Sequence, residues 1–468
     1  MTASLPAGFP RRGAWPAVRF ADPAEVTHLR ALRLTGTLDE ARLADAVRQV
    51  TAALPALRVE LVDGEPLRLR VRTAADDPAR TDLRHLTGPA RDHACAELLR
   101  TARDRPADRA EAHRARFHLV RLADDEIVLA LTAHSLVLDA RSVYALLGAV
   151  CQAYTGRFRA EQYRDPTPTP TTGPGPGAEP LAPLAPLSER ARASRRRWWT
   201  RRLAALPAPA DTTAGAARRG RESQTHRLRV PAGRWEALTT SAGPLGGNGS
   251  LAVMAVAAWC LRTPDSPGPG YFSTVVDLRD HLELGPLLGP FSDRLPFGVD
   301  LSGLSAPSFH DVLLRTQAGF LDAVVHYLPY DEVVALGVEL GRIAPPRTAA
   351  HWDVTLHFCR NPPASSATRG ERTLAEQGLS IELFRESDLL GAATSVPADR
   401  WDGVALDLRP GESGPDTELV LDIDRHHPRL GHAEHVLQVL DRTLDAAVTA
   451  PDAPLPPPHP APTTRRLP

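Results

Sequence analysis

Apolar residues recur at helical spacing in two segments of the first third of the chain. Residues 39–54 carry one stripe, and Asp39 ahead of it is typical of a helix N-cap. Residues 141–156 carry the other and end at Gly156, which favours a helix terminus. A further helix is predicted over 91–104. The two stripes consist of Leu43, Val47, Val50 and Leu54 and of Val143, Leu146, Leu147, Val150 and Tyr154.

Continuous or alternating apolar runs predict strands around these helices. Residues 28–36 form one strand, and 114–134 form two strands joined by a polar turn at Asp124 and Asp125. Residues 55–72 predict a hairpin that turns at 63–65. Strands and helices therefore alternate in this part of the chain.

The second half of the chain mixes strands and helices in similar numbers. Helices are predicted over 188–206, 250–262, 308–327 and 433–448, and strands over 223–231, 270–278, 295–301, 352–359, 403–410 and 418–424. Two α/β lobes, of mixed α/β (α+β) class, fit this order.

The clearest boundary is the segment 165–187. Prolines recur there every two or three residues with glycines between them, so an extended connector is predicted. The expected organisation is an N-terminal lobe over 1–164, a C-terminal lobe over 188–450 and a disordered tail over 451–468. Two domains also suit 468 residues, because single cores stop growing at about 250–300 residues.

Composition narrows the classes of protein. The formal net charge of −1 favours binding to neither nucleic acid nor an anionic membrane. No apolar run has the length of a membrane span, and the N-terminus has no signal-peptide core, so a cytoplasmic protein is expected. The four cysteines lie far apart, which favours structural thiols over zinc or disulfides. The sequence has no metal-ligand spacing, phosphate loop or nucleophile elbow.

The predicted helix over 188–206 holds seven arginines beside Trp198 and Trp199. One interpretation is a surface for nucleic acid or phosphate. The other is a solvated helix face that docks through its tryptophans, and the neutral overall charge favours it.

The segment Leu131–Ser142, LTAHSLVLDARS, carries the clearest candidate chemistry. His134 ends an apolar strand, where side chains often project into a cleft, and Asp139 precedes a helix. Taken alone, Asp139 is most simply an N-cap and His134 a hydrogen-bonded structural residue.

The spacing in this segment resembles that of the condensation domains of nonribosomal peptide synthetases, which belong to the chloramphenicol-acetyltransferase-like superfamily. Their motif is H-H-x-x-x-D-G, usually followed one residue later by serine. The corresponding residues of HSLVLDARS are His134, Ser135, Asp139, Ala140 and Ser142. The second histidine and the glycine of the motif are therefore replaced.

Other segments resemble the family in the same order along the chain. Leu57 and Arg58 match the end of its R-H-E-x-L-R motif, whereas Ala53-Leu54-Pro55 stand in place of R-H-E. RWWTRRLAALP and LPYDEVV match two further family segments.

Two more segments extend the resemblance. GPFSDRLPFGV resembles another family segment, with Asp293 for its asparagine and Gly298 for its arginine. VDLRDHLELGPLLG resembles the arginine-containing segment, which makes Arg279 the candidate partner of Asp139. The resemblance covers residues from about 25 to about 450.

The resemblance implies two acetyltransferase-like lobes in a V with a central tunnel. In such domains an acyl or peptidyl thioester on the phosphopantetheine arm of a carrier protein enters from one face. A small-molecule or carrier-bound nucleophile enters from the other, and the aspartate pairs with an arginine to hold the motif loop. A monomer that binds no metal and no cofactor of its own is expected.

Ser135 stands where the family has the histidine that acts on the nucleophile or the tetrahedral intermediate. A histidine accepts protons near neutrality, whereas a lone serine hydroxyl needs a neighbouring base. Loss of general-base help is worth about 10²–10⁴-fold in rate. His134 is a candidate replacement, although the family uses that position to brace the loop.

His357 is the other candidate base. On the predicted strand, Asp353, Thr355 and His357 share one face, which either lines the tunnel or faces solvent. Asp293 is a further candidate for the tunnel lining.

Two functions stay open. The first is a free-standing acyltransferase of nonribosomal-peptide-type biosynthesis, which joins or cyclises a carrier-bound acyl or peptidyl group with an amine or alcohol by a non-standard mechanism. The second is a non-catalytic protein that binds carrier proteins or recruits a tailoring enzyme, which the changes at Ser135, Ala140 and 53–55 favour. Because no adenylation or carrier sequence is attached, either protein is expected to act in trans.

Overall fold

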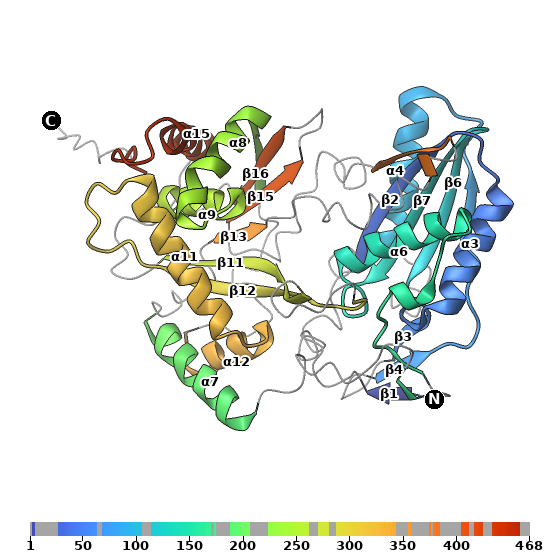
Figure 1. Ribbon diagram of the computed structural model, residues 1–468, viewed down its shortest axis with the longest axis horizontal. Helices are drawn as coiled ribbons and strands as arrows, with labels where there is room; N and C mark the ends of the chain where they lie inside the picture. The colour runs from blue at the N-terminus through green and yellow to red at the C-terminus, as the bar shows by residue number, and fades with distance from the viewer. Residues whose placement is uncertain are drawn as a thin grey trace. The chain divides into compact units, whose positions relative to one another are not determined.

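In the computed structural model the chain forms two compact units (Figure 1). Unit 1 comprises Met1–Leu187, Asp277–Asp293 and Pro362–Thr394, and unit 2 comprises the remaining segments, Ser188–Val276, Arg294–Asn361 and Ser395–Pro468. The structure describes residues 2–4, 27–62, 68–104, 114–169, 173–174, 188–205, 223–261, 270–279, 287–342, 354–357, 374–375, 378–383, 404–410, 416–424 and 433–458.

The first boundary falls at Leu187, the end of the proline-rich segment. Unit 1 also takes up 277–293 and 362–394, two stretches that the sequence places inside the C-terminal lobe. Unit 1 is therefore built from three separate segments of the chain, and a single boundary along the sequence does not divide the two units.

A five-stranded sheet forms the centre of unit 1, in the order β14-β2-β7-β6-β5. Neighbouring strands are antiparallel, except that β5 and β6 are parallel. The strands are β2 (Thr27–Thr35), β5 (Ala79–Asp82), β6 (Arg116–Ala123), β7 (Glu126–His134) and β14 (Ser380–Leu383). Every residue of β7 after Glu126 is buried, as expected of a central strand that is covered on both faces.

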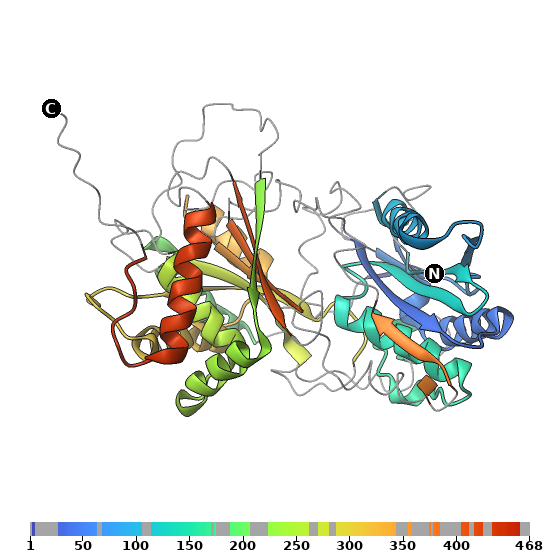
Figure 2. The same cartoon turned by 90° about the horizontal axis from the view of Figure 1, so that it is seen from above.

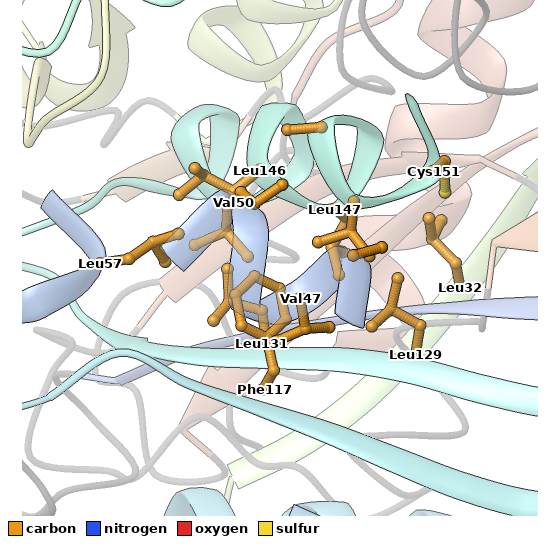
Figure 3. Close-up of a cluster of buried hydrophobic side chains, with 14 of the residues drawn as sticks. Leu32, Val47, Val50, Leu57, Phe117, Leu129, Leu131, Leu146, Leu147 and Cys151 are labelled. Atoms are coloured by element: carbon orange, nitrogen blue, oxygen red, sulfur yellow. The ribbon is translucent and has the colours of Figure 1, made fainter. Parts of the chain in front are cut away.

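Helices cover both faces of this sheet (Figure 2). α3 (Glu40–Ala53) and α6 (Ala140–Tyr154) pack on one face through the predicted apolar stripes, and α4 (Gly88–Asp104) packs on the other. Figure 3 shows side chains of α3 and α6 meeting over Leu129 and Leu131 of β7. Full burial of one such side chain stabilises the fold by about 1.5–3 kcal/mol.

The turn between β2 and α3 contains two residues with specific backbone tasks. The Asp39 side chain accepts a hydrogen bond from Arg42 N at 3.0 Å, so Asp39 is the N-cap that the sequence predicts. Gly36 has a φ of +132°, and a Cβ atom there would lie 2.7 Å from the Leu379 side chain. Only glycine fits where the late segment 378–383 adds β14 to the edge of β2.

Two short sheets complete unit 1. η2 (Pro55–Arg58) leads into β3 (Val59–Val62) and β4 (Arg68–Val71), which pair antiparallel as the predicted hairpin. β1 (Thr2–Ser4) joins β4, and β8 (Pro168–Thr169) pairs with β9 (Gly173–Pro174).

Unit 2 is built on a six-stranded sheet in the order β10-β16-β15-β13-β11-β12. β11, β13 and β15 are parallel to one another, and β16 is antiparallel to β15 and β10. The strands are β10 (Ser223–Val230), β11 (Gly270–Asp277), β12 (Ser292–Val299), β13 (Val354–His357), β15 (Val404–Pro410) and β16 (Thr417–Asp424). All six were predicted from the apolar runs.

A helical layer accompanies this sheet. α9 (Gly249–Cys260) packs against α8 (Ala232–Ala242), α11 (Phe309–Val325) and α15 (Ala433–Thr449). α7 (Glu189–Ala204) and α12 (Tyr330–Glu339) pack against each other (Figure 1).

The segment 451–458 corrects an expectation, because the sequence predicts disorder from Pro451. Leu455 is buried, and its N–H donates to Pro307 O at 2.8 Å. Trp259 Nε1 donates to Pro456 O at 2.7 Å. Proline cannot donate a backbone hydrogen bond, but its carbonyl accepts one, so this proline-rich stretch packs onto unit 2.

Cys95, Cys151 and Cys260 are buried, and Cys359 lies outside the described residues. Burial raises the pKa of Cys95 and of Cys260 to about 12. Among the described helices, none combines the length and apolarity that a membrane crossing needs.

Candidate functional site

The candidate motif lies where β7 ends in unit 1. His134, the last residue of β7, is opposite Thr27 of β2, and its side chain is buried. Its Nδ1 accepts a hydrogen bond from Leu136 N at 3.1 Å, and its carbonyl accepts from the N–H groups of Val137 and Leu138. The ring therefore braces the turn that follows.

This hydrogen bond also fixes the chemistry open to His134. Because Nδ1 accepts from a backbone N–H, a neutral ring carries its proton on Nε2. Nε2 is then a donor, suited to stabilising negative charge on an oxygen. It is not an acceptor for the proton of a nucleophile.

Ser135 follows directly and is 5% exposed. Within the described part of the chain, its hydroxyl makes no hydrogen bond to an imidazole or a carboxylate. The structure therefore shows no base that would activate this serine as a nucleophile.

Asp139 anchors the loop from its other end. As the N-cap of α6, it accepts from Ser142 N at 2.9 Å. It also accepts from the N–H groups of Phe291 and Ser292, each at 2.9 Å, and from Ser292 Oγ at 3.2 Å. One carboxylate thus joins the motif to the later segment 277–293.

Arg279 supplies the countercharge, as the sequence predicts. Its guanidinium donates to both oxygens of Asp139, at 2.7 and 3.1 Å, and both side chains are almost fully buried. Burial acts to raise the pKa of Asp139, but the charge of Arg279 and the hydrogen bonds hold that pKa below its usual range. Asp139 is therefore an ionised structural group.

The rest of the guanidinium is also satisfied. Arg279 donates to Leu287 O at 2.6 Å, to Gly289 O at 3.0 Å and to Ser142 Oγ at 2.8 Å, and it stacks on the Phe291 ring. Gly289 has a φ of +144°, and a Cβ atom there would lie 2.5 Å from that ring. Gly289 and Arg279 therefore belong to one hydrogen-bond network that holds the motif loop in place.

The replacement of the motif glycine by Ala140 has a simple physical account. Ala140 is the first residue of α6 and has helical backbone geometry, which alanine adopts readily. The position therefore does not need glycine in this chain.

Of the other predicted site residues, Asp293 lies in unit 1, directly after Ser292, whose N–H and hydroxyl donate to Asp139. Asp293 is buried at the second position of β12. Thr355 and His357 lie on β13, in unit 2, opposite Ala405 and Asp407 of β15, and the structure describes only their backbone. Asp353 lies outside the described residues. The proposed role of His357 as a base stays a prediction.

The structure adds one polar pair that the sequence analysis did not single out. His118 of β6 and Thr132 of β7 are buried, with Nε2 and Oγ1 3.2 Å apart. Thr132 Oγ1 donates to Arg116 O, so the hydroxyl accepts from His118 Nε2–H. Burial, helped by the charge of Arg116, lowers the pKa of His118 to about 4. In the sequence, the only signal for this pair is the position of His118 in the strand segment RFHLV, where alternate residues face the same side of the sheet.

The arginine-rich helix α7 docks in the way that the composition favoured. Trp199 is buried, and its Nε1 donates to His326 O at 3.0 Å. Ion pairs with acidic residues of α11 and α12 take up Arg192, Arg196 and Arg202. Nothing in this arrangement is specific to nucleic acid.

The polar groups of the site suit a particular chemistry. The described residues contain no cluster of three metal-ligating side chains. A rigid loop holds a buried imidazole and a buried hydroxyl at the end of a strand. Such a loop can fix the orientation of a reactant, and among the described residues it has no general base beside Ser135.

Comparison with known proteins identifies relatives. The family model "Condensation domain" matches residues 27–339. The crystal structure of the tallysomycin biosynthesis protein TlmII is similar with a TM-score of 0.77 and 46% identity, and the match covers 97% of this chain and 100% of that chain.

Two further proteins are similar to this chain, one at lower sequence identity and one over a shorter stretch. The SgcC5 protein from Streptomyces globisporus matches with a TM-score of 0.66 and 22% identity over 96% of this chain and 100% of that chain, which shows the fold alone. The isonitrile lipopeptide synthase of Mycobacterium tuberculosis (strain ATCC 25618 / H37Rv) is 33% identical over 158 residues. That match covers 33% of this chain and only 6% of the length of that protein.

Proposed function

Because the chain belongs to the condensation-domain family, we propose that it is an acyltransferase of natural-product biosynthesis. It joins or cyclises a carrier-bound acyl or peptidyl group with an amine or an alcohol in the cytoplasm. The similarity to the tallysomycin biosynthesis protein supports this setting, since the two chains match over almost their whole lengths.

The proposal rests on one observation: the ion pair that holds the motif loop is present, although the residue at position 135 is changed. Asp139 and Arg279 hold the motif loop through a fully buried ion pair. Two motif positions are changed: Ala140 replaces a glycine at the start of α6, and Ser135 replaces the histidine that carries the chemistry. A rigid loop of this kind retains the positioning part of catalysis and gives up proton transfer by that histidine.

In the proposed reaction the nucleophile attacks the thioester carbon, and a tetrahedral oxyanion forms. The motif loop, which His134 braces, holds the reactants in position, and the thiolate of the carrier arm leaves as the oxyanion collapses. The proton released by an amine passes to water or to the departing thiolate. Orientation of two bound reactants can contribute about 7–11 kcal/mol, which is sufficient for an intrinsically good nucleophile. The carrier's phosphopantetheine arm belongs to the substrate, and the protein needs no cofactor of its own.

The test is incubation of the full chain with an acylated carrier protein and a panel of amines and alcohols. Product formed faster than in the absence of the protein supports the proposal. His134→Ala should abolish that acceleration, whereas Arg84→Ala, on an exposed ion pair, should preserve it. Product formation at the uncatalysed rate with every nucleophile would reject it.

A second function is favoured by the missing base at Ser135. In this alternative the chain binds a loaded carrier protein, or recruits a tailoring enzyme to it, without catalysis. Copurification of the loaded carrier protein with the chain, together with no acceleration of any transfer reaction, would establish the alternative.

A further inference from the structure

The outer face of α11 in unit 2 carries an apolar stripe. Leu314, Leu321 and Val325 are 49%, 58% and 65% exposed, although the opposite face of the same helix is buried through Phe309 and Leu313. Contiguous exposed apolar side chains of this size mark association surfaces more often than isolated ones do.

The exposed face of α11 has two edges of different chemistry, of which the apolar stripe is one. An α-helix advances about 100° per residue, so Leu314, Leu321 and Val325 lie together on one side of Ala318. Arg315 and Asp322 lie together on the other side of Ala318, which is itself exposed. The helix thus presents an apolar edge and a charged edge, with a small residue between them.

We infer that this face of α11 pairs with the same face of a second copy of the chain, antiparallel about a two-fold axis beside Ala318. A two-fold axis reverses the residue order and brings each edge against its own counterpart. Arg315 then comes level with Asp322 of the second copy. Along the helix axis, Leu314 lies between Leu321 and Val325 of the second copy, so the side chains of the two apolar edges interdigitate.

The charges on this face fit the pairing. Arg315 is exposed and makes no ion pair within the described residues. Asp322 accepts from Arg202 of its own chain through Oδ2 at 3.0 Å, and its Oδ1 has no hydrogen-bond partner in the described part of the chain. In the dimer, each Asp322 therefore binds Arg202 of its own chain and Arg315 of the second copy. Each of these two ion pairs occurs twice because of the two-fold symmetry.

Ala318 at the centre permits the close approach that the pairing requires. Small side chains at a helix crossing let two backbones lie near 8 Å apart, the lower end of the usual range of about 8–10 Å. A bulky residue there would separate the leucines that have to interdigitate.

The size of the stripe sets the strength of association. The segment from Asp311 to Val325 is about 21 Å long. One helix of this length buries less than the roughly 800 Å² per partner of a standard interface. We therefore expect a reversible dimer with a Kd on the order of 10–100 µM, in place of the monomer expected from the sequence.

Sedimentation equilibrium of the full chain, from about 1 to 500 µM, tests this pairing. The weight-average mass should rise from one chain towards two chains over this range. Leu321→Arg should hold the mass at one chain throughout. Arg190→Asp, an exposed position of α7 away from the stripe, should leave the wild-type curve unchanged.

A charge-exchange experiment separates this geometry from other dimers. Arg315→Asp alone sets two aspartates level across the axis, and Asp322→Arg alone sets two arginines level. Each variant should be monomeric by itself. An equal mixture of the two should dimerise, because opposite charges are then level on both sides of the axis. Circular dichroism and the Tm establish that each variant is folded.

A wild-type chain that stays monomeric at 500 µM would overturn the inference and leave the stripe to a different protein. A dimer that is unaffected by Leu321→Arg would place the contact on another surface and overturn it equally. The proposed acyltransferase function does not depend on either result.

Discussion

Arg279 and Asp139 are joined by two hydrogen bonds, 2.7 and 3.1 Å long, although they lie 140 residues apart in the sequence. Both side chains are almost completely buried. The pair fastens the segment 277–293 to the loop that carries His134 and Ser135. The ion pair is thus the charged centre of the hydrogen-bond network that also joins Phe291 and Ser292 to Asp139.

Arg279→Ala is expected to destabilise the protein by about 3–5 kcal/mol, because it leaves the charge of Asp139 buried without a partner. Urea unfolding followed by tryptophan fluorescence measures the loss. Arg84→Ala removes an arginine from an exposed ion pair and should cost much less than Arg279→Ala. Equal effects of the two substitutions would contradict a structural role for the buried pair.

His118 should make stability depend on pH. Its pKa is about 4 in the folded chain and ~6.5 in an unfolded one. The unfolded state therefore binds more protons between these values, and stability falls as the pH falls from 6.5 towards 4, by up to about 3 kcal/mol. His118→Gln should flatten the curve of unfolding free energy against pH in this window. A variant curve parallel to that of the wild type would show that His118 is not buried as described.

Leu455 should contribute to the stability of unit 2. Leu455→Ala empties a buried position and is expected to cost about 2–4 kcal/mol. The exposed neighbour Pro457 provides the control, since Pro457→Ala should change the unfolding free energy by less than about 1 kcal/mol. Thermal unfolding of both variants decides the point, and an unchanged Tm for Leu455→Ala would mean that segment 451–458 is not packed in solution.

Ser135→Ala and Ser135→His probe the changed motif position in opposite directions. Removal of the hydroxyl should alter the transfer rate by no more than about threefold, because no carboxylate or imidazole among the described residues is bonded to this serine. Introduction of histidine should raise the rate by up to about 10²-fold by restoring general-base help. Rates with one acylated carrier and one amine provide the comparison. A loss of several orders of magnitude in Ser135→Ala would instead make the serine a nucleophile.

Much of this architecture could be predicted from local pattern. The stripes of α3 and α6, the N-caps Asp39 and Asp139, the strands β2, β6 and β7, and all six strands of the unit 2 sheet follow from apolar spacing and capping chemistry. The condensation-domain family and its α/β fold are confirmed by the match over residues 27–339 and by the solved structures. The partner of Asp139 was accessible only through the family's segment order.

Other features depend on contacts that no local pattern contains. β14 pairs with β2 from more than 340 residues away, and the reason for Gly36 is the side chain of Leu379. His118 looks like any strand residue until its burial lowers its pKa. Segment 451–458 misled the sequence analysis because a high proline content suggests disorder, whereas carbonyl acceptors and Leu455 hold it in place.

The pH dependence of the transfer rate tests the central claim, acyl transfer on a positioned loop without a base from the protein. For an amine acceptor, the logarithm of the rate should rise with a slope near one through pH 6–8, following ionisation of the amine itself. An inflection near ~6.5, the ordinary pKa of histidine, would reveal an imidazole base and contradict this claim. So would a rate equal to that of the carrier and the amine alone at every pH.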